Sequence, residues 1–86
     1  AMIASTRQET PVVQKGIEGL QADRKALMAE LQFNETQLAR YQQLATTDTI
    51  AKKDLEQAQT AVTSLHEKLN TMNANLQAQQ ARLIQL

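Results

Sequence analysis

Near the middle of the chain, helical periodicity lapses within the stretch Arg40-Tyr41-Gln42-Gln43-Leu44-Ala45-Thr46-Thr47-Asp48-Thr49-Ile50-Ala51-Lys52-Lys53-Asp54. The sequence on both sides of this stretch has the pattern of a long amphipathic helix. At its centre, Thr46-Thr47-Asp48-Thr49 are poor helix formers, because their short polar side chains compete for backbone hydrogen bonds. Two long helices separated by a short break predict a hairpin whose tip is residues 46–50.

The first helix is expected over residues 11–46, with a frayed or helical lead-in from Ser5 as the alternative. Thr10-Pro11 favours a start at residue 11, because Thr can cap free N–H groups and Pro loses no hydrogen bond in the first turn. Beyond it, seam positions follow in alternating steps of four and three, the pattern of a coiled coil. They are Val13, Ile17, Leu20, Arg24, Leu27, Leu31, Asn34, Leu38, Tyr41 and Ala45. The two polar members either fix the register of the seam or reach solvent with their side chains.

The second helix is expected over residues 51–86, where the same stepping continues. Its seam positions are Leu55, Ala58, Val62, Leu65, Leu69, Met72, Leu76, Gln79, Leu83 and Leu86. If the chain folds back near Asp48, the numbers of paired residues add up to about 97. This register places Leu38 near Ala58, Leu31 near Leu65, Leu27 near Leu69 and Leu20 near Leu76.

The predicted fold class is therefore all-α, an antiparallel two-helix coiled-coil hairpin that forms a single domain over residues 1–86. At a rise of about 1.5 Å per residue, each helix would be roughly 50 Å long. An alternative is one continuous long helix that pairs with a second chain, because isolated two-helix hairpins bury little surface.

Composition excludes several classes of function. Lys and Arg together number 9, as do Asp and Glu, and both halves of the chain are neutral, so no basic face for nucleic acid or an anionic membrane is expected. No apolar run approaches the roughly 18–20 residues of a membrane span. With no Cys, one His and no Gly-rich phosphate loop, the sequence predicts no enzyme, cofactor or metal site.

Some polar and small residues off the seam have two readings. His66 flanks the seam and is expected to be solvated. Gly16 and Gly19 weaken the first helix, which points to fraying or to a close approach of the two helices. Abundant Gln on the outer faces, as at Gln42 and Gln57, suits either solvation or lateral packing of several hairpins.

The tip carries apolar side chains among polar ones. Leu44 and Ile50 lie beside Arg40, and such a group is suited to docking a protein partner. The same two apolar residues could instead close the last layer of the seam.

The tip resembles that of the periplasmic adaptor proteins, the membrane fusion proteins of the HlyD, AcrA and MacA type. The family pattern is Arg, three residues, Leu, six residues and Ser, followed in the second helix by an acidic residue and an Ala. This sequence has Arg40 and Leu44 at that spacing, and Asp54 and Ala58 after them. The closer similarity covers about residues 38–60, and the flanking heptads resemble the family in periodicity alone.

The family's Ser position is occupied by Ala51. A Ser there would cap the second helix, and Asp54 three residues later would complete a capping box. Ala cannot cap, which costs about 0.5–2 kcal/mol unless Asp48 or Thr49 takes over. The third family contact is therefore expected to differ at this tip.

The resemblance implies the hairpin of an adaptor subunit in a tripartite exporter of Gram-negative bacteria. Such a protein is periplasmic and anchored at the inner membrane, and about six copies assemble side by side into a conduit. Their tips dock on a TolC-like outer-membrane channel, and the inner-membrane transporter is bound through lipoyl-like and β-barrel domains that lie outside this chain. The chain is accordingly expected to be a fragment that makes no direct membrane contact.

By carry-over from the family, the Arg40 side chain would bind backbone or carboxylates of the channel, and Leu44 would fill an apolar groove there. Thr47, Asp48, Ile50 and Ala51 complete the expected docking site. The alternative function is a generic coiled-coil spacer or dimerisation module whose tip has no special role.

Overall fold

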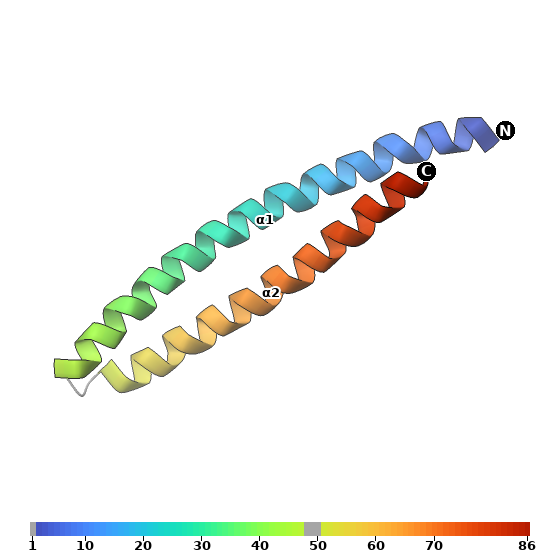
Figure 1. The fold of residues 1–86 in the computed structure, drawn as a ribbon. Helices are drawn as coiled ribbons and strands as arrows, with labels where there is room; N and C mark the ends of the chain where they lie inside the picture. The colour runs from blue at the N-terminus through green and yellow to red at the C-terminus, as the bar shows by residue number, and fades with distance from the viewer. Residues whose placement is uncertain (1, 48–50) are drawn as a thin grey trace.

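The fold is an antiparallel pair of helices, as the sequence predicts. In the computed structural model, backbone is described for residues 2–47 and 51–86 and side chains for residues 9–47 and 52–86. Helix α1 spans Met2–Thr47 and helix α2 spans Ala51–Gln85. The two helices run side by side with both chain ends at the same end of the molecule (Figure 1). The result is a rod with principal extents of 69 × 15 × 14 Å.

Helix α1 begins nine residues earlier than predicted, and the expected start at Pro11 is wrong. Pro11 lies inside the helix, more than two turns from its first residue. The fixed φ of Pro is helical, so the cost at this position is one backbone hydrogen bond and some crowding of the preceding turn. Residues 2–10 contain no Gly and no other Pro, so nothing upstream stops the helix. The additional turns make the rod longer than the predicted 50 Å.

The break between the helices falls within the predicted Thr-rich segment. The Thr46 hydroxyl donates to the Gln43 carbonyl at 2.6 Å, and the Thr47 hydroxyl donates to the Leu44 carbonyl at 3.4 Å. Carbonyls in the last turn of a helix lack some of their backbone partners, so these side chains satisfy acceptors where α1 ends. Helix α2 then begins at the predicted residue, Ala51, with Asp54 in its first turn.

The seam is the interface between the helices. Every predicted seam position except Leu86 is at least partly buried, and the most buried apolar residues all belong to the seam. They are Val13, Ile17, Leu31, Val62, Leu65 and Leu76.

These buried residues form two clusters rather than one continuous core. The cluster toward the chain ends contains Val13, Ile17, Leu20, Leu76 and Leu83. The cluster toward the tip contains Leu27, Leu31, Leu38, Val62, Leu65 and Leu69. Three of the four predicted neighbour pairs share a cluster, as the register with numbers that add up to about 97 requires.

A polar contact separates the two clusters. The Arg24 Nε donates to the Asn73 Oδ1 at 2.8 Å, from α1 to α2, and both side chains are partly buried. Their numbers add up to 97, the value that the hairpin register requires. Because neighbouring registers would break this bond, Arg24 favours one alignment of the helices.

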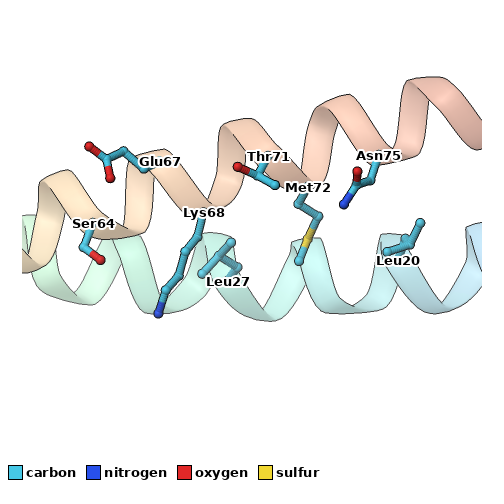
Figure 2. Close-up of a pocket in the computed structure, with 8 residues that line it drawn as sticks. All are labelled: Leu20, Leu27, Ser64, Glu67, Lys68, Thr71, Met72 and Asn75. Atoms are coloured by element: carbon cyan, nitrogen blue, oxygen red, sulfur yellow. The ribbon is translucent and has the colours of Figure 1, made fainter.

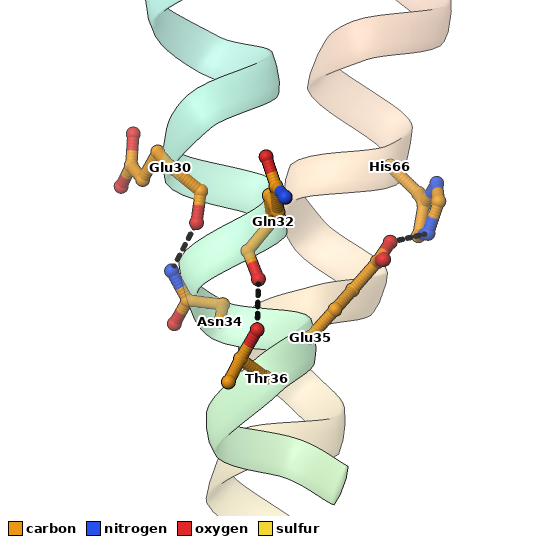
Figure 3. Close-up of polar contacts among 6 residues, drawn as sticks. All are labelled: Glu30, Gln32, Asn34, Glu35, Thr36 and His66. Carbon is orange, nitrogen blue, oxygen red and sulfur yellow. Dashed lines mark hydrogen bonds and ion pairs between the residues drawn. The ribbon is translucent and has the colours of Figure 1, made fainter.

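Among the described residues, Asn34, the second polar seam position of α1, and the two glycines of α1 differ from Arg24 in making no contact with α2 of this kind. The Asn34 Nδ2 donates to the Glu30 carbonyl within its own helix at 2.8 Å (Figure 3). At Gly16 and Gly19, an added Cβ would have no heavy atom within 4 Å beyond its own surroundings in the helix. The helices therefore do not approach closely at either glycine, and the close-approach reading is wrong for this hairpin.

None of the helices in the described part of the chain is both long and apolar enough to span a membrane. Within the same residues, no group of three or more His, Cys, Asp or Glu side chains could hold a metal ion.

Candidate functional site

The tip end of α1 exposes three of the residues predicted to bind a partner, Arg40, Leu44 and Thr47. Tyr41 and Ala45 face α2 as seam residues, and this orientation turns Arg40 and Leu44 outward. Leu44 is 45% exposed, so it does not close the last layer of the seam. One helical turn separates Arg40 from Leu44, and side chains four residues apart lie on the same face of a helix.

Arg40 is available to a partner. Its side chain is exposed, and within the described part of the chain it makes no ion pair or hydrogen bond. It borders an open hollow of about 610 Å³ on the outer face of α1, together with Thr36, Ala39, Gln42, Gln43 and Thr46. A guanidinium with free donors beside an apolar side chain can bind carboxylates or carbonyls while the Leu side chain is buried against the same partner.

The remaining predicted tip residues are placed only in part. Thr47 is exposed and is the last residue of α1, while Ala51 is the first residue of α2 and its side chain is not described. Asp48 and Ile50 lie outside the described residues. Arg40, Leu44 and Thr47 are therefore the predicted site residues whose side chains the structure describes, and all three are exposed.

The two long sides of the rod, where the helices border each other, differ in polarity, and we name them by the heptad positions that lie there. In α1, Ile17 and Leu31 take position a and Leu20 takes position d; in α2, Val62 takes position a and Leu65 takes position d. Residues at e of both helices then meet along one side, and residues at g meet along the other. We call these the e side and the g side.

The e side carries polar contacts between the helices. The His66 Nε2 lies 3.2 Å from the Glu35 Oε1 (Figure 3), and the Arg24–Asn73 bond lies on the same side. His66 and Glu35 are both about half exposed, so their interaction adds little stability. The sequence predicts a solvated His66 beside the seam, and in the structure His66 is exposed but has a partner on α1.

The g side carries an open apolar groove. It has a volume of about 580 Å³, and Leu20, Leu27 and Met72 give it an apolar lining (Figure 2). Its remaining lining comes from α2, namely Ser64, Glu67, Lys68, Thr71 and Asn75. The seam residues Leu20, Leu27 and Met72 line this open groove, so solvent reaches part of the apolar seam on the g side.

Two residues that matter to these surfaces were missed by sequence reasoning. Asn73 could have been found from the register, because it is the residue paired with Arg24 when the numbers add up to 97. Phe33 is 62% exposed and points away from the seam, which its heptad position could have indicated.

Neither a family model nor a curated protein nor a solved structure matches the chain. The fold and the exposed tip define a class, an antiparallel coiled-coil hairpin, and its function has to be argued from its own residues.

Proposed function

We propose that this chain is the hairpin of a periplasmic adaptor subunit, and that it docks its tip on a TolC-like outer-membrane channel in a tripartite exporter. The observation that carries the proposal is the outward orientation of Arg40 and Leu44 at the tip end of α1. The spacing of these two residues is the one in which the sequence resembles the adaptor family.

The two side chains have complementary tasks in this proposal. Leu44 loses apolar surface to water when it enters a groove on the channel, which drives association. Arg40 contributes charge-assisted hydrogen bonds to carbonyls or carboxylates at the mouth of the channel, which fix the orientation of the tip. In the proposed assembly, the helices are a stalk that carries the tip to the channel, and several copies, about six, pack side by side as a conduit.

Ala51 stands where the adaptor family has Ser, so we expect this tip to make two of the family's contacts with the channel, through Arg40 and Leu44. The Ala51 methyl group offers no hydroxyl to the channel, so the family's third contact is absent or is made by another residue. Binding by this tip would therefore depend more heavily on Arg40 and Leu44 than in relatives that carry Ser.

The test is binding of the purified chain to a purified TolC-like channel in detergent, measured by surface plasmon resonance. Arg40→Asp and Leu44→Asp are each expected to weaken binding at least tenfold. Lys25→Asp and Ile84→Asp are matched controls, because they make the same kinds of change at exposed positions far from the tip. Binding that both tip variants leave unchanged, or no binding by the parent chain, would contradict the proposal and favour a spacer or dimerisation module.

A further inference from the structure

An exposed stripe runs along α1 beside the seam, and it contains both Arg40 and Leu44. It follows the same alternating steps of four and three residues as the seam, through heptad positions c and g, and consists of Phe33, Gln37, Arg40, Leu44 and Thr47. Side chains at these spacings lie on one face of a helix. Four of the five are exposed and Gln37 is half-buried, so the stripe is open to a partner along its whole length. We call it the tip stripe.

Phe33 is the member of the tip stripe that the hairpin itself does not use. Its side chain is 62% exposed, whereas the most buried apolar residues of α1 all lie in the seam. Leu44, at the other end of the stripe, is 45% exposed. Aromatic side chains offer a large apolar area to a partner, and aromatic residues and Arg are enriched among those that dominate binding.

The spacing of these residues is that of a helix that binds along a groove. Eleven residues separate Phe33 from Leu44, a distance of about 16 Å along the helix axis, and Arg40 lies between them. Apolar anchors repeated along one face are how an amphipathic helix binds in a groove of another protein. A partner that fits the tip stripe therefore has two apolar pockets with a hydrogen-bond acceptor between them.

The charge of the tip stripe agrees with such a partner. Residues 33–47 contain two charged side chains, Glu35 and Arg40. Glu35 lies on the e side, where it contacts His66, so Arg40 carries the charge of the tip stripe. A cation between two apolar anchors selects a groove that presents a carboxylate or a carbonyl at that point.

We propose that Phe33 is a further docking residue of the tip, and that it enters an apolar pocket in the same channel groove as Leu44. The inference rests on the proposed function, because it assigns Phe33 to the partner that Arg40 and Leu44 bind. Continuity argues for that partner: Phe33 lies two helical turns from Arg40 on the same stripe, so a groove that follows α1 beyond Arg40 reaches it next.

The proposal sets how far the channel overlaps the hairpin. Phe33 lies fourteen residues before Thr47, the last residue of α1, which is about 21 Å along the helix axis. A partner that met the hairpin end-on would not reach Phe33. The channel must therefore lie alongside α1 for about four turns, and neighbouring hairpins of the conduit must leave this stretch of the tip stripe free.

Binding to a purified TolC-like channel in detergent, measured by surface plasmon resonance, tests the role of Phe33. Phe33→Ala is expected to weaken binding about tenfold, the size of effect that an aromatic anchor produces. Phe33→Leu should keep most of the affinity, because an apolar side chain remains. Met28→Ala is the matched control: Met28 is 44% exposed and lies less than two turns from Phe33, but at position e. Circular dichroism checks that each variant stays helical.

The same measurement separates failure of this inference from failure of the proposed function. If Arg40→Asp and Leu44→Asp weaken binding but Phe33→Ala does not, the channel meets the tip alone and the role of Phe33 is overturned. Equal losses from Phe33→Ala and Met28→Ala would overturn it as well. If the parent chain does not bind the channel, the proposed function fails and this inference fails with it.

Photo-cross-linking gives a second measurement that does not depend on affinity. A benzophenone side chain is introduced in place of Phe33 in one chain and in place of Met28 in another, and the purified channel is added. The Phe33 position is expected to cross-link to the channel, and the Met28 position is not. A product that joins two hairpin chains through the Phe33 position, with none to the channel, would show that a second copy covers Phe33 and would overturn the proposal.

Discussion

At the scale of single residues, the bond between Arg24 and Asn73 has the most influence on the fold. It joins α1 to α2 at 2.8 Å and lies between two apolar clusters that would tolerate sliding of one helix along the other. A Leu at position 24 would add apolar area, but it would remove a hydrogen bond that joins the two helices. Arg24 therefore buries less apolar surface than Leu would, but its hydrogen bond to Asn73 fixes the register of the two helices.

A double-mutant cycle measures this contact. Arg24→Ala and Asn73→Ala should each lower the free energy of unfolding, and the coupling between them should be about 0.5–1.5 kcal/mol, the range for a partly exposed hydrogen bond. Urea denaturation of the parent, the two single variants and the double variant gives the four values. Strictly additive effects would mean that the bond does not contribute to stability in solution.

At the scale of the helices, the two clusters provide the stability. Leu65 is among the most buried side chains of α2 and packs with Leu31 and Val62. No part of the seam is sealed from water on all sides, so each layer contributes less than a fully enclosed core would.

Leu65→Ala is expected to cost about 2–3 kcal/mol, the low end of the range for a buried Leu, because water can reach the space that is left. Ile84→Ala is the matched control: Ile84 is 86% exposed, and its truncation should change stability by less than about 0.5 kcal/mol. Thermal denaturation followed by circular dichroism compares the two. Equal losses for both variants would contradict the assigned seam.

The helices also show what could be predicted from sequence and what could not. The seam and its register could be read because burial of one face imposes a strict period, so Leu31 and Leu65 were paired correctly. The start of α1 could not be predicted, because the Thr10-Pro11 pair is compatible both with a helix that begins there and with a helix that begins several residues earlier.

At the tip, sequence alone left open whether Leu44 is a seam residue or an exposed one. The answer depends on where the last layer of the seam ends, and the structure puts that layer at Tyr41 and Ala45. Asp48 and Ile50 stay predictions, as does the contact made by the tip at Ala51.

At the scale of the whole molecule, the hairpin is a rod of 69 Å with a Cα radius of gyration of 19.6 Å. Small-angle scattering should therefore give a long dimension near 69 Å for the hairpin. A continuous helix of the same chain would be a rod of roughly 130 Å. A long dimension near that value would contradict the hairpin in solution.

The central claim is that the tip end of α1 is the part of the molecule that meets the channel. Its most direct test is photo-cross-linking, with a benzophenone side chain introduced at exposed positions on the chain and a purified TolC-like channel added. A probe at Gln43, beside Arg40 and Leu44, is expected to cross-link to the periplasmic end of the channel, whereas a probe at Gln80, near the opposite end of the rod, is not. Cross-linking from Gln80 and not from Gln43, or from neither position, would contradict the claim.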